Sequence, residues 1–167
     1  MKRRSGSALV ESAVTIPLVV LLLVGMNQLA KFTYTYYTLR KTVYSIGEFL
    51  SGQQGVNFCS TADPTVSAAI TFGLTGTTDP TSPALVTGLD PSMIQITAER
   101  ATYGGPGAPF TLSDCSCAPD CDISQGAIPP DFIVVTVAGY MLTPRIPMVP
   151  MVPIALTPTV KVPYGGT

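Results

Sequence analysis

Four cysteines are the side chains of this sequence whose type and spacing could do chemistry. Cys115, Cys117 and Cys121 are close together, and Cys59 lies far upstream. Four thiolates could hold a zinc ion, but Cys-x-Cys-x-x-x-Cys lacks the Cys-x-x-Cys pairs of common zinc ribbons. Even numbers of cysteines in exported chains form disulfides. We therefore expect two disulfides, one joining Cys59 to a member of the cluster and one closing a small loop, with a redox-active role as the alternative.

Other reactive groups give little support to catalysis. Asp114, Asp120 and Asp122 flank the cysteines and could bind calcium, although aspartate in a polar loop is mostly a solvated turn residue. The chain has no histidine, and we find no serine-nucleophile motif, phosphate loop or acid pair in a catalytic context. A net charge of −1 without a basic patch does not support nucleic-acid binding. The sequence predicts a non-enzymatic protein with no cofactor and no metal.

A lone acid, Glu11, lies at the head of the most apolar stretch of the chain. Residues 12–30 carry no charge, and at about 1.5 Å per residue they span the roughly 30 Å hydrocarbon core of a bilayer. A secretory signal peptide fits poorly, because no small-residue cleavage site follows Met26. A plain membrane anchor fits, but it leaves Glu11 without the partner that an ionisable group in lipid requires.

Charge and cysteine positions predict the orientation of this span. The basic residues 2–4 favour a cytoplasmic N-terminus, although Lys31, Arg40 and Lys41 on the far side weaken that signal. All four cysteines follow the span, which fits an oxidising compartment such as the periplasm. We expect the N-terminus in the cytoplasm and the C-terminal head in the periplasm.

The helix is predicted to continue beyond the membrane, from Ser7 to Ser51, until Gly52 and Gly55 end it. Its second half carries an apolar heptad stripe: Phe32, Tyr36, Leu39, Val43, Ile46 and Leu50. The stripe could pack on the chain's own head, line a seam with other subunits, or do both. A further set of aromatic side chains suits the membrane interface: Tyr34, Tyr36, Tyr37 and Tyr44.

The remainder is rich in proline and glycine and predicts a small, loop-rich head that contains β-structure. A short helix is expected over 61–74, with Asp63 as its N-cap, and a loop over 75–92. A strand is expected over 93–103, followed by a Gly-rich break.

Two further strands are predicted near the C-terminus. Residues 132–142 give the strongest strand pattern, and residues 154–162 are expected to pair with them, with Pro158 favouring an edge position. Between them, the Pro-rich segment 143–153 must be extended and is unusually apolar. It could wrap its own domain, or it could contact a partner or the membrane face.

The N-terminal pattern resembles the processing site of type IV prepilins. A cut between Gly6 and Ser7 would make Glu11 the fifth residue of the mature chain, directly before an apolar helix. In that family the glutamate is thought to neutralise the new N-terminal amine of a neighbouring subunit. An ammonium and a carboxylate that meet in low dielectric are far better off than either alone.

The resemblance becomes closer when several motifs are taken in order. The basic leader ending in Gly6, the Ser-Ala-Leu-Val-Glu-Ser-Ala start, Ile-Pro-Leu in the span, the Tyr-rich helix, the Cys-x-Cys loop and the Pro-rich segment before a closing strand are similar to TadE-like minor pseudopilins of Flp (tight adherence, Tad) pili. The resemblance implies Gly6 and Ser7 as the prepilin-peptidase junction and Glu11 as the acid needed for processing or assembly. The small, polar junction residues depart from major Flp pilins, which argues against a major-pilin role.

The expected fold class is α+β, a long N-terminal helix with a small antiparallel β head stapled by disulfides. We divide the chain into a leader (1–6), a transmembrane helix half (7–30), an amphipathic helix continuation (31–52) and an exported head (53–167) with the Cys loop 115–121. The resemblance implies other pilin subunits, a prepilin peptidase, the pilus assembly machinery and the membrane as partners. The competing hypotheses are an unprocessed, membrane-anchored periplasmic binding protein and a thiol or metal protein.

Overall fold

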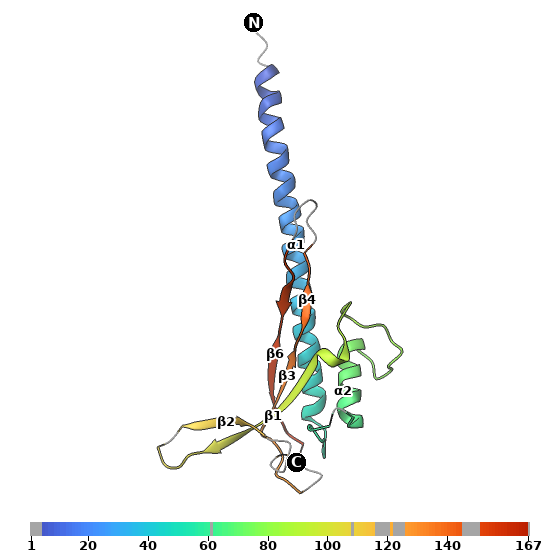
Figure 1. Ribbon diagram of the computed structural model, residues 1–167, viewed down its shortest axis with the longest axis vertical. Helices are drawn as coiled ribbons and strands as arrows, with labels where there is room; N and C mark the ends of the chain where they lie inside the picture. The colour runs from blue at the N-terminus through green and yellow to red at the C-terminus, as the bar shows by residue number, and fades with distance from the viewer. Residues whose placement is uncertain are drawn as a thin grey trace.

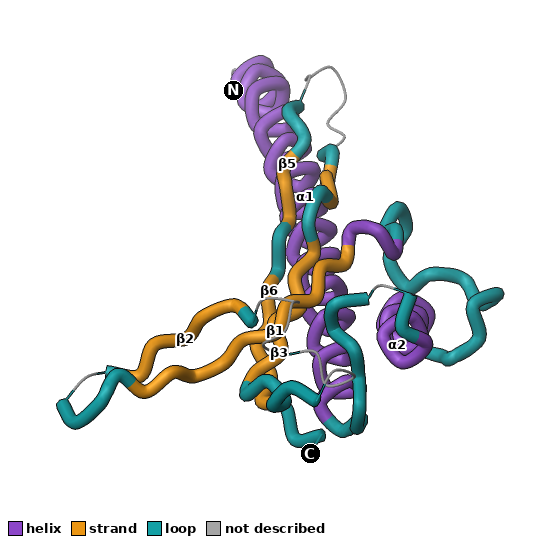
Figure 2. The backbone as a smooth tube through the Cα atoms, turned by 60° about the horizontal axis from the view of Figure 1, so that its bottom comes forward, coloured by secondary structure: helices purple, strands orange, loops and turns teal. Residues whose placement is uncertain are grey.

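The computed structural model of the chain describes residues 5–60, 62–107, 109–115, 121, 126–144 and 151–166. One long helix, α1 (Ser5–Ser51), projects from a small head that contains antiparallel strands and a second helix (Figure 1). The predicted α+β class is confirmed. The C-terminal half of α1 contacts both the sheet and the second helix, so it is the central layer of the head (Figure 2).

Helix α1 is 47 residues long and runs through Pro17 without ending. Four members of the predicted apolar stripe are completely buried in the head: Leu39, Val43, Ile46 and Leu50. Phe32, one of the stripe's first members, packs at the edge of this core, whereas Tyr36 is exposed. The stripe therefore packs on the chain's own head, and the helix ends just before Gly52, where the sequence predicts its end.

The main sheet covers one side of α1. Its strands, in the order β2-β1-β3-β6, are Phe110–Asp114, Ile94–Tyr103, Phe132–Val137 and Thr159–Pro163, and all neighbours are antiparallel. Along β3 the side chains alternate, with Ile133, Val135 and Val137 buried and the intervening ones half-buried. This period of two is the pattern of a strand with one face on the core, and here the core face includes α1.

The two predicted C-terminal strands pair as expected, but each is interrupted. Gly139 has φ +81°, a conformation that glycine adopts without strain, and it separates β3 from β4 (Tyr140–Leu142). Thr157 and Pro158 separate β5 (Ile154–Leu156) from β6, because proline has no N–H to continue the hydrogen bonding of a strand. The prediction of continuous strands over 132–142 and 154–162 was thus wrong. β3 pairs with β6 in the main sheet, while β4 and β5 form a separate two-stranded sheet.

Helix α2 (Pro64–Thr75) lies against α1, and its predicted cap is confirmed. The Asp63 carboxylate accepts hydrogen bonds from the backbone N–H groups of Thr65 (2.8 Å) and Val66 (3.2 Å). These bonds satisfy donors that have no partner inside the first turn of a helix. The helix begins three residues later than the predicted range 61–74, because the cap itself fixes its first turn.

Two glycines allow close packing around α1. A Cβ atom at Gly73 of α2 would overlap the Ile46 side chain and lie 3.2 Å from the carbonyl oxygen of Thr42. On the opposite side of α1, a Cβ atom at Gly47 would lie 2.7 Å from Cγ2 of Val162 in β6. The absence of a side chain at these two positions sets how near α2 and the sheet come to the helix.

The end of the chain returns to the end of α1. The Tyr164 hydroxyl donates a hydrogen bond to the Gln53 carbonyl oxygen (2.7 Å), and the Gly165 N–H donates to that of Ser51 (3.0 Å). The Tyr164 ring also meets the Phe58 ring edge-on, with centroids 5.3 Å apart. Burial raises the pKa of the Tyr164 phenol above its usual value, and a backbone hydrogen bond opposes this in part. These contacts join the C-terminal strand to the helix on which the head is built.

Candidate functional site

The predicted processing residues lie at the start of α1. The Glu11 side chain is exposed, and none of the described residues forms an ion pair with it. Gly6 and Ser7 belong to the first turns of the same helix. Residues four apart lie on the same helix face, so Ser7 and Glu11 are one turn apart along α1.

The N-terminal half of α1 presents apolar side chains with no cover from the head. Its large exposed residues run from one end of the stretch to the other: Leu9, Val10, Val14, Ile16, Leu18, Val19, Val20, Leu21, Leu22, Leu23, Met26 and Leu29. Within the described chain, α1 is the helix long and apolar enough to cross a membrane, over Leu9–Ser51, and its most apolar window has no buried residue. A surface this apolar requires lipid or other apolar helices around it.

Beyond this stretch, tyrosines of α1 stay exposed, and Tyr34 also lines a pocket with Tyr140 of the head. Tyr34, Tyr37 and Tyr44 are all exposed, with Lys41 in the same row at spacings of three and four. Residues with this spacing share one face of a helix. The row forms a polar-tipped aromatic surface that follows the apolar stretch along α1, as expected for a membrane boundary or a subunit contact.

The cysteine cluster contains a disulfide between Cys115 and Cys121, whose Cα atoms are 5.5 Å apart. Cys59 is also disulfide-bonded, and Cys117 lies outside the described residues. Because a disulfide occupies two of the four sulfurs, the zinc interpretation loses its four-thiolate ligand set. The Arg100 guanidinium donates to Sγ of Cys121 (3.2 Å) and to the Ile128 carbonyl oxygen, so these two residues are bound to β1.

Asp120 and Asp122, which were weighed as calcium ligands, lie outside the described residues. Among the residues that the structure does describe, no three histidine, cysteine or acidic side chains gather where they could hold a metal ion. The ion pair between Lys161 and Glu99 spans β3, with the Lys161 ammonium 4.8 Å from the centroid of the Phe132 ring. This pair connects three strands and acts in the sheet rather than in a cleft.

The sequence analysis missed strand β2, which forms a projecting hairpin with the end of β1 (Figures 1 and 2). We call residues 99–114 the β1–β2 arm. Tyr103 pairs with Phe110, with ring centroids 5.2 Å apart, and Ala101 pairs with Leu112, so the outer part of one face is apolar, while the Glu99–Asp114 pair makes its base acidic. The other face carries polar side chains such as Thr102 and Thr111. The alternation Phe-Thr-Leu-Ser-Asp at 110–114 was the signal that could have identified it.

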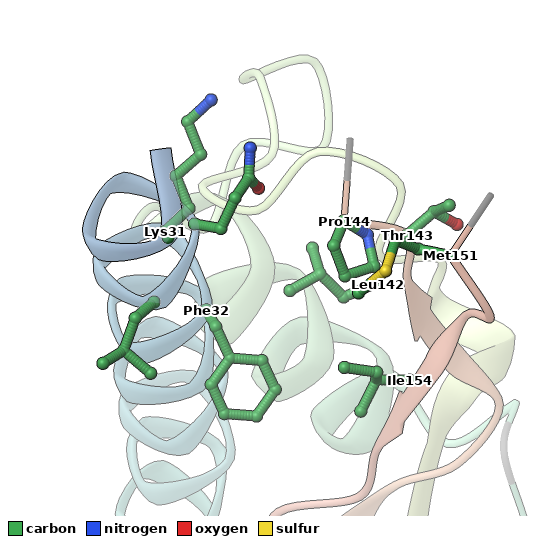
Figure 3. Close-up of a pocket in the computed structure, with 10 residues that line it drawn as sticks. Lys31, Phe32, Leu142, Thr143, Pro144, Met151 and Ile154 are labelled. Carbon is green, nitrogen blue, oxygen red and sulfur yellow. The ribbon is translucent and has the colours of Figure 1, made fainter. Parts of the chain in front are cut away.

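An apolar groove of about 510 Å³ lies between α1 and the β4–β5 hairpin (Figure 3). Its described lining is Gly25, Gln28, Leu29, Lys31 and Phe32 from α1 and Leu142, Thr143, Pro144, Met151 and Ile154 from the hairpin. Phe32 points from the helix toward Leu142 and Ile154 across the groove. The described part of the Pro-rich segment, 143–144 and 151–153, thus lies beside the helix rather than around the rest of the head.

Comparison with known proteins gives one family match. The family described as TadE-like protein matches residues 6–46, which include the predicted junction at Gly6 and Ser7, Glu11, the apolar stretch and the tyrosines. The match supports a protein associated with a Tad pilus. No curated protein and no solved structure matches the chain.

Proposed function

With a TadE-like segment at residues 6–46 as the premise, we propose that the chain is a minor pilin or pseudopilin, a structural or assembly subunit of a bacterial Tad/Flp pilus. A prepilin peptidase removes residues 1–6, and the mature chain begins at Ser7. The N-terminus lies in the cytoplasm and the head in the periplasm, from where the subunit can enter an extracellular pilus. Its partners are other pilin subunits and the pilus assembly machinery, and its role is not enzymatic.

The observation that carries this proposal is the exposed carboxylate of Glu11 at the head of the uncharged, apolar stretch 12–30. In lipid, such a group needs a cation, and the described part of its own chain provides none. The amine freed at Ser7 of a neighbouring subunit supplies one. At 4 Å and an effective dielectric constant of 20, this attraction amounts to about 4 kcal/mol, enough to favour assembly of processed subunits over unprocessed ones.

Trimming removes three basic residues as well as creating the amine. The mature chain has six basic and ten acidic side chains, so its formal net charge changes from −1 to −4 before the new N-terminus is counted. The removed cluster at 2–4 is the strongest signal for the cytoplasmic end of the span. Removal therefore takes away the charges that orient the span, while the apolar helix remains as the assembly surface of the mature subunit.

Mass spectrometry of the membrane-extracted chain, co-expressed with a prepilin peptidase, tests the proposal. The wild-type chain should begin at Ser7, and the Gly6→Leu variant should keep Met1. Glu11→Ala should lower processing or recovery in complexes with other pilins at least tenfold, the factor that corresponds to about 1.4 kcal/mol. Glu48→Ala removes an exposed acid from the same helix outside the apolar stretch and serves as the matched control.

Two results would contradict the proposal. If the wild-type chain keeps Met1 or is cut near residue 27, it is a tethered periplasmic protein or a secreted one. If Glu11→Ala leaves trimming, complex formation and fibre production at the level of Glu48→Ala, the carboxylate has no part in assembly.

A further inference from the structure

The β4–β5 hairpin lies at the same level of α1 as the end of the apolar stretch. The helix side of the groove lies within residues 25–32. This range covers the end of the uncharged segment 12–30 and Lys31, the first charged residue after it. At 1.5 Å per residue, Gly25 lies only about 8 Å from Ala30 along the helix axis. If α1 crosses a bilayer, the groove therefore lies in the outer part of the hydrocarbon layer and at the phosphates above it.

The described residues of the hairpin have the chemistry of a membrane-facing surface. Residues 138–144 and 151–158 carry no charge. The large exposed side chains among them are all apolar: Met141, Met151, Val152 and Ile154. Val152, with 81% of its surface exposed, is the most exposed of these. An uncovered apolar set on a secreted head is unfavourable in water and favourable at a lipid surface.

The volume of the groove favours an acyl chain over a helix of a partner protein. One turn of α-helix, about 10 Å across and 5.4 Å long, fills about 420 Å³, so the 510 Å³ groove would hold little more than one turn. An acyl chain is narrower and can enter from the lipid side along Gly25 and Leu29. Lys31 lies at the rim, where its ammonium can meet a lipid phosphate.

We propose that the β4–β5 hairpin is a second membrane contact, and that the groove between it and α1 holds an acyl chain of a phospholipid from the periplasmic leaflet. Lys31 faces the phosphate of that lipid. The hairpin lies at the interface rather than deep in the bilayer, because its two strands have outer edges whose backbone groups need water. This inference rests on the proposed crossing of the membrane by α1, and not on the pilin role.

The chain has no tryptophan, so single tryptophans report on chosen sites without background. The full chain is reconstituted in vesicles of phosphatidylethanolamine and phosphatidylglycerol with phosphatidylcholine brominated at different depths. Val152→Trp and Ile154→Trp report on the hairpin and the groove. Leu22→Trp, in the middle of the span, reports on the anchor, and Phe110→Trp, at the tip of the β1–β2 arm, is the control expected to stay in water.

We expect Val152→Trp and Ile154→Trp to lose about half of their emission to bromines near the headgroup, the depth of about 5–10 Å that interfacial segments reach. Leu22→Trp should be quenched most by bromines near the chain ends, and Phe110→Trp by none. Lys31→Gln in the Ile154→Trp background should weaken the headgroup-level quenching, because it removes the phosphate partner.

The outcomes separate this inference from the proposal on which it rests. If Leu22→Trp is not quenched, the anchor itself is wrong. If Leu22→Trp is quenched while Val152→Trp and Ile154→Trp behave like Phe110→Trp, the anchor stands and the lipid contact is overturned. If Ile154→Trp escapes bromine and shifts to the blue only at high protein-to-lipid ratio, a second copy covers the groove, and the lipid proposal is likewise overturned.

Discussion

Replacing Gly73 with alanine should loosen the contact between α1 and α2. In an exposed helix the change would stabilise the protein by up to about 1 kcal/mol, because alanine is the better helix former. Here the added Cβ atom overlaps the side chain of Ile46, a completely buried residue, and approaches the Thr42 carbonyl oxygen. Overpacking of this kind costs about 1–3 kcal/mol. We expect a net loss of about 1–2 kcal/mol, since the packing cost exceeds the gain in helix propensity.

Thermal unfolding of the detergent-solubilised full chain, followed by near-ultraviolet circular dichroism of the tyrosines, measures this loss. The midpoint should fall by about 5 °C for a head of this size. Gly52→Ala is the matched control, because no atom lies within 4 Å of the Cβ position there. It should change stability by less than about 0.5 kcal/mol.

A double-mutant cycle tests the stated cause. In the Ile46→Ala background, Gly73→Ala should lower the free energy of unfolding by at least about 1 kcal/mol less than it does in the wild type, because the overlapping atoms are gone. A Gly73→Ala variant as stable as wild type, or an unchanged cost without the Ile46 side chain, would refute the view that this glycine sets the distance between the helices.

Two further predictions concern the ends of the head. The Cys115→Ala/Cys121→Ala variant should have a free energy of unfolding lower by about 2 kcal/mol, as expected for a short closed loop. An unfolding midpoint in urea equal to that of the wild type would show that this disulfide does not stabilise the head. For Tyr164 the pKa is raised by burial, so its contribution to stability is fully present below the ordinary tyrosine pKa of about 10 and is lost as the pH rises through the higher folded value. Tyr164→Phe should remove this alkaline dependence and lower stability near pH 7 by about 1 kcal/mol through loss of the hydrogen bond to Gln53, which unfolding measured from pH 7 to 11 would detect.

Much of the architecture could be predicted because it follows from local pattern. The heptad stripe from Leu39 to Leu50 identified the buried face of α1, and Asp63 followed by Pro64 identified the start of α2. Both are signals in which side-chain spacing or backbone chemistry acts within one or two turns. The antiparallel pairing of the C-terminal strands followed from their position in the chain.

The errors came from features decided by tertiary contacts. β2 was missed because all five of its residues are exposed and its short pattern competes with a Gly- and Pro-rich surrounding. The runs 132–142 and 154–162 looked continuous because their composition does not reveal that Gly139 and Pro158 change the strand partner. The close approach at Gly47 and Gly73 also could not be predicted, since a helical glycine gives no sign of what lies opposite.

For the candidate site, the sequence located Gly6, Ser7 and Glu11 by their order before an apolar stretch, and their roles remain predictions. It also indicated that the Pro-rich segment could contact a partner or the membrane. It could not reveal the groove, because the groove is formed by α1 and a hairpin more than a hundred residues away in the chain. Only the packing of β4 and β5 beside residues 25–32 brings these surfaces together.

The uninterrupted passage of α1 from the apolar stretch into the centre of the head has a directional consequence. No flexible linker separates the apolar stretch from the head within α1, so the rotation of the helix in the bilayer fixes the direction in which the head points. One residue added after Ala30 would turn the head by about 100° about the helix axis, and the β1–β2 arm would sweep round with it. The number of residues between Glu11 and Leu39 thus determines the direction in which the head of each subunit points about the helix axis.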